Sequence, residues 1–306
     1  MLITPQVLSR LDSMELRARQ IVEGFITGMH KSPYYGFSVE FAEHRPYNTG
    51  DELRHIDWKV YAKRERYYVK QYEEETNLRS VILLDVSPSM WFKYFGDWSK
   101  LKYGAHFAAA LMYMMNRQRD ATGLITFDDQ IRDWYPPKTS RRHIQLMYKQ
   151  LEKYAAENRE KSSEQRGTAS ADVLHEVAER IHKRSLVIII SDLFENTREQ
   201  ERLISALKHL RHKKHEVILF NVLEKRSERE FDFPDRKYTF SDLETGRSLE
   251  LLPVRIRKEY RDRVAEWTKR FRIACHEAHI DFEEIDTEGA FDMALLAYLT
   301  KRRKIG

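Results

Sequence analysis

Two short and wholly apolar segments constrain the fold of this 306-residue chain more than any other feature. Residues 81–84 (Val-Ile-Leu-Leu) and 186–190 (Leu-Val-Ile-Ile-Ile) contain no polar position. A strand without a polar face is expected where helices cover the sheet on both sides, as they do in parallel sheets. Neither segment approaches the roughly 18 apolar residues of a membrane-spanning helix, so we expect no membrane span.

The chain from residue 80 onward alternates between strand and helix patterns. The predicted strands cover residues 81–84, 124–127, 131–135, 186–190, 216–222 and 280–285. The predicted helices cover residues 99–117, 141–156, 171–183, 197–210, 254–279 and 290–302. Such alternation predicts an α/β fold with a mostly parallel sheet and helices on both faces. Residues 229–252 have the pattern of a hairpin inserted on the rim of this domain.

The N-terminal part of the chain has a different pattern. Residues 6–29 carry the apolar spacing of a helix, whereas residues 34–79 are aromatic and rich in turn signals, with a strand pattern at 67–72. We therefore predict a small N-terminal helix and β element over residues 1–79, followed by an α/β domain over residues 80–306.

Oxygen-bearing side chains follow the two apolar strands. The first strand runs into Asp85, Ser87 and Ser89, the second ends before Asp192, and Thr168 precedes a predicted helix. Ligands of open α/β sheets bind beyond the carboxyl ends of the strands, and carboxylate and hydroxyl oxygens suit Mg²⁺, Mn²⁺ or Ca²⁺ better than zinc. The Asp-x-Ser-x-Ser pattern alone also fits a helix-start loop in which both serines cap backbone groups. Taken together, the five residues predict one divalent-cation site, with Mg²⁺ as the first expectation.

This set of residues resembles the metal-ion-dependent adhesion site (MIDAS) of von Willebrand factor A domains. Residues 40–78 are similar to the signature of the bacterial domain of unknown function 58 (DUF58) family, whose members carry such a domain behind this segment. The resemblance covers residues 20–300 and implies a von Willebrand factor A-like, Rossmann-like domain. It further implies that the serine and threonine hydroxyls bind the metal and that the aspartates act directly or through water. Ala169 and Leu193 depart from the Asp or Asn and the Gly that are common at these positions.

Residues 50–58 (Gly-Asp-Glu-Leu-Arg-His-Ile-Asp-Trp) form a second charged motif. Asp51, Arg54 and Asp57 can form a charge-assisted network in which the guanidinium forks onto one carboxylate. With Trp58, this network either braces the β element structurally or forms a partner surface beside the metal. Both interpretations stay open at this point.

Two classes of function remain for the predicted site. The resemblance implies a non-enzymatic adaptor or co-chaperone that works with a MoxR-type AAA+ ATPase on an unknown client protein. The chain has no Gly-x-x-x-x-Gly-Lys-Ser/Thr motif, so the ATPase would supply nucleotide hydrolysis. The alternative is a Mg²⁺-dependent phosphatase or phosphotransferase with Asp85 as nucleophile. Such enzymes typically need a second aspartate two residues on as general acid, where this chain has Ser87.

The composition of the chain limits the class of partner and the cellular compartment that we expect. The 53 Lys and Arg residues against 48 Asp and Glu residues leave a net charge of only +5, which by itself is too weak to imply nucleic-acid binding, because DNA binders usually concentrate Lys and Arg on one face. The single cysteine, Cys275, excludes an internal disulfide framework and fits a reducing compartment. The N-terminus lacks the apolar stretch of a signal peptide. We therefore expect a cytoplasmic protein that does not bind nucleic acid.

Overall fold

The computed structural model of the chain comprises two compact units, the first formed by residues 1–27 and 78–306 and the second by residues 28–77. The residues described are 8, 11–30, 44–46, 68–70, 78–156, 170–192, 197–243 and 246–305. In the second unit, β1 (His44–Pro46) pairs antiparallel with β2 (Tyr68–Lys70). Helix α2 (Met14–His30) lies mostly in the first unit, together with the sheet, rather than with the β element that follows it.

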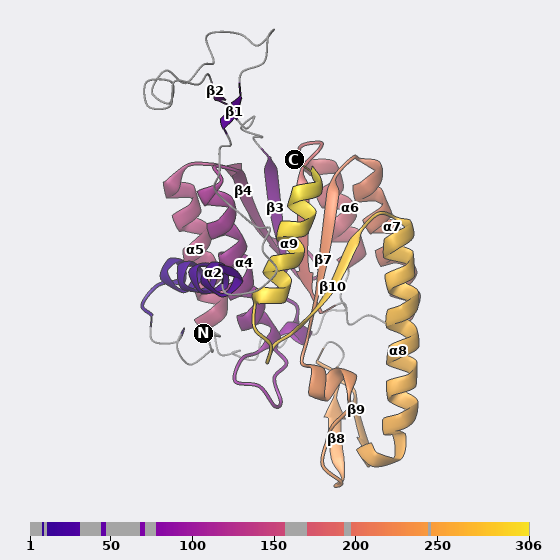
Figure 1. Ribbon diagram of the computed structural model, residues 1–306. Helices are drawn as coiled ribbons and strands as arrows, with labels where there is room; N and C mark the ends of the chain where they lie inside the picture. The colour runs from indigo at the N-terminus through magenta and orange to yellow at the C-terminus, as the bar shows by residue number, and fades with distance from the viewer. Residues whose placement is uncertain are drawn as a thin grey trace. The chain divides into compact units, whose positions relative to one another are not determined.

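The first unit is built on one six-stranded sheet (Figure 1). Its strands are β3 (Arg79–Asp85), β4 (Ala121–Phe127), β5 (Ile131–Lys138), β6 (Leu186–Ser191), β7 (Glu216–Leu223) and β10 (Asp281–Asp286). The spatial order is β10-β7-β6-β3-β4-β5, and only the edge strand β5 is antiparallel to its neighbour. Counted along the chain, this is the 3-2-1-4-5-6 order of doubly wound sheets, which reverses between β3 and β6. The predicted α/β fold with a mostly parallel sheet is confirmed.

Helices cover both faces of this sheet (Figure 1). They are α4 (Lys100–Arg117), α5 (Arg141–Ala156), α6 (Ser170–Arg180), α7 (Thr197–His212), α8 (Pro253–Glu277) and α9 (Asp292–Ile305). Val81 and Leu83 of β3 lie in a core cluster with residues of α6, α7 and α8, whereas Leu84 faces α4. Every residue of 81–84 and 186–190 is at most 1% exposed, as expected for strands covered on both sides.

Short elements extend the unit at the carboxyl edge of the sheet (Figure 1). A 3₁₀ turn, η2 (Pro88–Trp91), follows β3, and a single π-helical turn, η3 (Lys225–Arg229), follows β7. Within the predicted hairpin stretch, β8 (Tyr238–Ser241) pairs antiparallel with β9 (Ser248–Leu251).

Among the described residues, no helix has the length and apolar character needed to cross a membrane.

Helix α4 packs closely over the strands that meet where the sheet order reverses. Its N-terminus is capped by Ser99, whose side chain accepts a hydrogen bond from the backbone N–H of Lys102. A Cβ placed on Gly104 would lie 3.2 Å from Leu84 Cδ1 and 3.2 Å from Ile190 Cγ2. Because Gly104 has no side chain, the N-terminal part of α4 can pack closely against the ends of β3 and β6.

We predict that Gly104→Val lowers the free energy of unfolding by about 1–3 kcal/mol, because added atoms overpack this contact. Urea denaturation followed by circular dichroism measures the loss. Gly96→Ala is the control, since a Cβ there would meet its nearest atom, Glu288 Cγ, at 3.5 Å. Equal stability of both variants and the wild type would show that the close approach of α4 does not matter.

Candidate metal site

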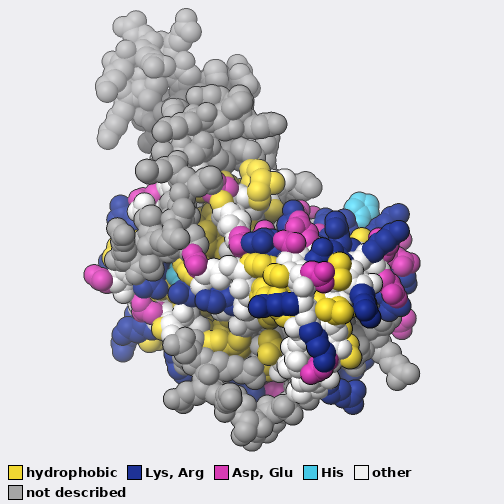
Figure 2. All heavy atoms as spheres, turned by 90° about the horizontal axis from the view of Figure 1, so that it is seen from below, with side chains coloured by type: hydrophobic (Ala, Val, Ile, Leu, Met, Phe, Trp, Pro, Cys, Tyr) yellow, Lys and Arg dark blue, Asp and Glu magenta, His cyan; other side chains and the backbone are white. Residues whose placement is uncertain are grey.

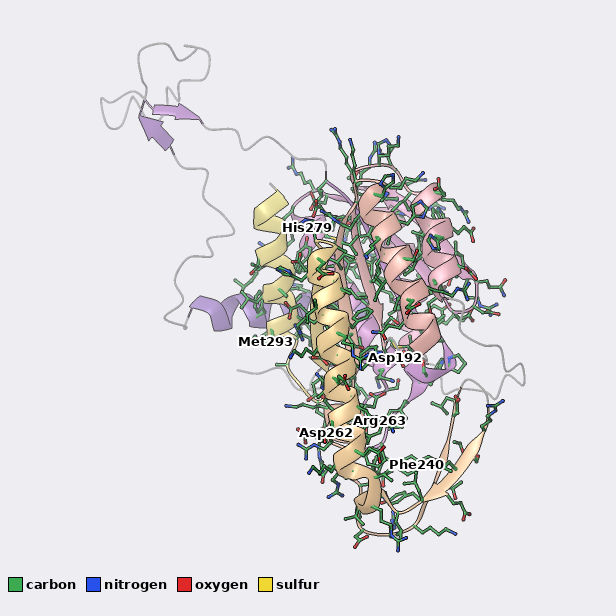
Figure 3. All side chains as sticks on the ribbon, turned by 90° about the vertical axis from the view of Figure 1, so that its right-hand side faces the viewer. Asp192, Phe240, Asp262, Arg263, His279 and Met293 are labelled. Atoms are coloured by element: carbon green, nitrogen blue, oxygen red, sulfur yellow. The ribbon has the colours of Figure 1, made fainter. Side chains whose placement is uncertain are left out.

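The candidate site lies where β3 and β6 end side by side. The register pairs Leu84 with Ile190, which places Asp85 beside Ser191. The Ser191 hydroxyl donates a hydrogen bond of 2.6 Å to Asp85 Oδ2. Asp192 follows at once and lies at the carboxyl edge of the sheet (Figure 3). This is the point at which the strand order reverses, and such switch points are the ligand-binding crevices of open α/β sheets.

The loop after β3 turns its hydroxyl groups toward one another. The backbone N–H of Val86 donates to Phe127 O at 2.7 Å, which anchors the start of the loop to β4. The backbone N–H of Ser87 donates to Asp85 Oδ1 at 2.9 Å, and Ser87 Oγ lies 3.0 Å from Ser89 Oγ. Ser87 precedes the 3₁₀ turn, but its side chain makes no capping hydrogen bond. The helix-cap alternative therefore does not account for the Ser87 hydroxyl.

The two aspartates are buried beside each other. Asp85 is 2% exposed and Asp192 is 6% exposed. Burial, with the like charge of Asp192, raises the pKa of Asp85 to about 7, although hydrogen bonds from Ser191 and Ser87 favour its carboxylate. A pair of buried carboxylates is costly unless positive charge lies nearby. A nearby cation would therefore stabilise both carboxylates.

One such cation is part of the chain. Lys100, at the start of α4, is fully buried, and its Nζ donates hydrogen bonds of 2.6 Å to Asp192 Oδ2 and 2.6 Å to Glu228 Oε1. Burial lowers the pKa of Lys100, but the two carboxylates outweigh burial and hold its pKa above the ordinary value. Burial also raises the pKa of Glu228, an effect that Lys100 opposes. Within the described part of the chain, the Lys100 ammonium therefore pairs with both Asp192 and Glu228, while Asp85 accepts hydrogen bonds from hydroxyl and backbone N–H donors.

The lysine joins the site to the elements at the end of β7. Glu228 Oε2 accepts the backbone N–H of Glu224 at 2.7 Å. Glu224 Oε1 in turn accepts the backbone N–H groups of Tyr94, Phe95 and Gly96 at 2.9, 2.8 and 2.9 Å. Burial raises the pKa of Glu224, but these donors and the Ser227 hydroxyl outweigh it and lower the pKa. The loop that follows η2 is thereby pinned to η3.

The oxygen atoms that the structure brings together fit a hard divalent cation. Neighbouring ligands in an octahedral magnesium site, each about 2.1 Å from the ion, lie about 3.0 Å apart. The Ser87 and Ser89 hydroxyl oxygens have this separation, 3.0 Å. Ser89 is only partly buried, so this side of the site faces solvent. No group of three or more His, Cys, Asp and Glu side chains within the described residues is placed to hold a metal.

The structure describes some of the predicted site residues and not others. Asp85, Ser87, Ser89 and Asp192 lie near one another at one edge of the sheet. Thr168 lies outside the described residues, and so does the charged motif of 50–58 with Asp51, Arg54, Asp57 and Trp58. Their roles stay predictions.

Sequence reasoning missed Lys100, which pairs with Asp192, and the residues that hydrogen-bond around the site, namely Ser191, Glu224 and Glu228. One signal was available for the lysine. Residues 100, 104, 107 and 111 share the buried face of α4, and a lysine in line with such a stripe needs a buried acidic partner.

The chain was compared with known families and curated proteins. The family model described as "Protein of unknown function DUF58" matches residues 43–270. The uncharacterized protein Rv1480 of Mycobacterium tuberculosis (strain ATCC 25618 / H37Rv) is 26% identical over 247 residues, which are 79% of this chain and 72% of the relative. The uncharacterized protein Mb1516 of Mycobacterium bovis has the same identity and coverage.

Two solved structures are similar over most of the chain. The SpRpn10 VWA domain is 13% identical with a TM-score of 0.34, covering 75% of this chain and 96% of the domain. An uncharacterized membrane spanning protein from Vibrio fischeri is 12% identical with a TM-score of 0.23, covering 74% of this chain and 98% of the other. These likenesses are too distant to transfer a function.

We predict that Lys100→Met lowers the free energy of unfolding by about 3–5 kcal/mol, because it leaves Asp192 and Glu228 buried without their cation. Lys102→Met on the same helix is the matched control. That ammonium lies 5.3 Å from the centre of the Trp98 ring, a contact of about 0.5–1 kcal/mol. Thermal and urea denaturation compare the two variants, and equal losses would contradict a structural role for the buried ion pairs.

Proposed function

The chain belongs to the DUF58 family of proteins of unknown function, and we propose that it is a non-enzymatic protein-interaction module with a divalent cation as its docking point. Asp85, Ser87, Ser89, Asp192 and Thr168 hold the ion in this proposal. The observation that carries it is the burial of two carboxylates against two hydroxyls 3.0 Å apart at the switch point of the sheet. Mg²⁺ suits this oxygen set best, and Mn²⁺ and Ca²⁺ accept the same ligands.

A bound cation would attract a carboxylate of the partner. Five protein ligands leave room for one more oxygen around an octahedral ion. The contact between a divalent ion and a carboxylate is strong in a partly desolvated interface. The partly buried Ser89 marks the side from which that carboxylate would approach.

A MoxR-type AAA+ ATPase is the partner that we propose, with the chain acting in the cytoplasm as an adaptor or co-chaperone for a client protein. The resemblance of residues 40–78 and of the aspartate–serine set to the DUF58 pattern supports this partner. The chain has no nucleotide-binding Gly-x-x-x-x-Gly-Lys-Ser/Thr motif. The energy for remodelling a client would therefore come from the ATPase.

The phosphatase alternative is less well supported by the geometry. Both oxygens of Asp85 already accept hydrogen bonds, from the Ser87 N–H and the Ser191 hydroxyl, which make the carboxylate a weaker nucleophile. The position of the usual general acid is taken by Ser87, whose hydroxyl faces Ser89.

We predict that Mg²⁺ and Mn²⁺ bind the purified protein at one site and that Asp85→Ala abolishes this binding, because it removes a charged ligand. Thr168→Ala weakens binding without lowering the melting temperature. Isothermal titration calorimetry measures the affinity. Ser80→Ala is the control, since Ser80 is a fully buried serine at the opposite end of the same strand. Unchanged binding by Asp85→Ala would contradict the site.

We also predict that a purified MoxR-type ATPase binds the wild type in Mg²⁺ and binds far less in EDTA or to Ser87→Ala/Ser89→Ala. Losing a central, desolvated charged contact costs about 2–5 kcal/mol, or roughly 30- to several-thousand-fold in affinity. Surface plasmon resonance measures the difference, again with Ser80→Ala as control. Equal affinity in all conditions would exclude docking through the metal.

A further inference from the structure

Three side chains from two distant parts of the chain meet at the rim hairpin, which lies beyond the sheet edge of the candidate metal site. Tyr94, in the loop after η2, donates a hydrogen bond of 3.0 Å from its hydroxyl to the Tyr238 hydroxyl on β8. The Arg236 guanidinium lies 5.0 Å from the centre of the Tyr238 ring. Hydrogen bonds to Tyr238 and Tyr94 raise the pKa of Arg236. We name Tyr94, Arg236 and Tyr238 the phenol–guanidinium cluster.

Aromatic packing and a backbone hydrogen bond hold Tyr94 of the cluster in place. The Tyr94 ring packs edge-on against Phe233, with ring centres 4.9 Å apart, and Phe233 is only 5% exposed. Phe233 also packs edge-on against Phe240 of the hairpin, at 5.0 Å. The hairpin extends beyond the edge at which Asp192 lies, as the labels of Asp192 and Phe240 show in Figure 3. The backbone of Tyr94 is fixed in addition by Glu224.

The charge of Arg236 is exposed and not neutralised by a carboxylate. Within the described part of the chain, no acidic side chain lies within ion-pair distance of Arg236. Its neighbours differ in this respect, because Lys237 pairs with Glu250 and Arg226 pairs with Asp232 at 3.3 Å. Tyr94 is 40% exposed beside it. Figure 2, seen from below the view of Figure 1, shows Lys, Arg, Asp and Glu side chains among hydrophobic ones.

We propose that the phenol–guanidinium cluster is a second recognition contact for the protein partner, and that it binds a second carboxylate of an acidic partner segment. This inference rests on the proposed function, in which the first carboxylate binds the metal. A guanidinium forms paired hydrogen bonds with a planar carboxylate, and two phenols that orient it reduce the entropy lost on binding. The Tyr94 ring offers an apolar surface to the rest of the segment.

The surroundings favour an acidic protein segment over a nucleic acid. Burial raises the pKa of Glu288, and the nearby carboxylates of Asp286 and Asp97 raise it further. These three acids line the same rim near Glu224 and Arg226. A continuous polyanion would be repelled there, whereas a segment with two separate carboxylates can place one at the metal and one at Arg236.

The test uses fluorescein-labelled decapeptides with two glutamates at separations of one to five residues. Matched peptides carry one glutamate and one glutamine, or two glutamines. Fluorescence anisotropy in Mg²⁺ measures binding to the full chain. We expect Arg236→Gln to weaken binding of the best two-glutamate peptide about 5-fold, the size of an exposed ion pair, and to leave one-glutamate peptides unchanged. Tyr94→Phe, which keeps the ring, weakens it by a smaller factor.

Lys237→Gln is the matched control, because it removes the same charge from the next residue and should change affinity less than 2-fold. Equal effects of Arg236→Gln and Lys237→Gln in a Mg²⁺-dependent complex would overturn the inference and leave the metal proposal intact. Weakening by Arg236→Gln in a complex that EDTA does not change would support the cluster and overturn metal docking. Absence of binding by every peptide would contradict both.

Discussion

The burial of Asp85 beside Asp192 is the constraint on which the rest of the site depends. Two carboxylates in a low-dielectric crevice repel each other and are poorly solvated, so nearby positive charge stabilises their ionised forms. Lys100 supplies one charge, and it reaches Asp192 because Gly104 lets α4 settle onto β3 and β6. That charge is shared with Glu228. A divalent cation at Asp85 would complete the balance, which is why we interpret the crevice as a metal site.

The same charge network links the crevice to the rim. The path runs from Asp192 through Lys100 and Glu228 to Glu224, and then to the backbone of residues 94–96. Asp192 and the loop of residues 94–96 are therefore linked by one set of ion pairs and hydrogen bonds. A partner that binds both the metal and the rim would meet a surface already in place, so little ordering would be needed on binding.

Local pattern predicted the fold and the centre of the site for physical reasons. Strands covered on both faces must be apolar throughout, and parallel strands end at one edge, so Asp85 and Asp192 could be placed together before the structure was known. Lys100 could not, because its partners lie 92 and 128 residues away and only packing brings them within reach. The role of Glu224 could not be predicted for the same reason, because the backbone N–H groups that donate hydrogen bonds to it come from a distant part of the chain. Thr168 lies outside the described residues, and its role stays a prediction.

The most direct test of the central claim is a crystal of the chain grown with Mn²⁺ and measured at a wavelength where manganese scatters anomalously. The account predicts one strong anomalous peak bounded by the oxygen atoms of Asp85, Ser87 and Ser89, and loss of that peak in crystals of Asp85→Ala. It would be contradicted by density that shows the Asp85 carboxylate closed off by protein groups alone, with no peak at this edge of the sheet at saturating Mn²⁺.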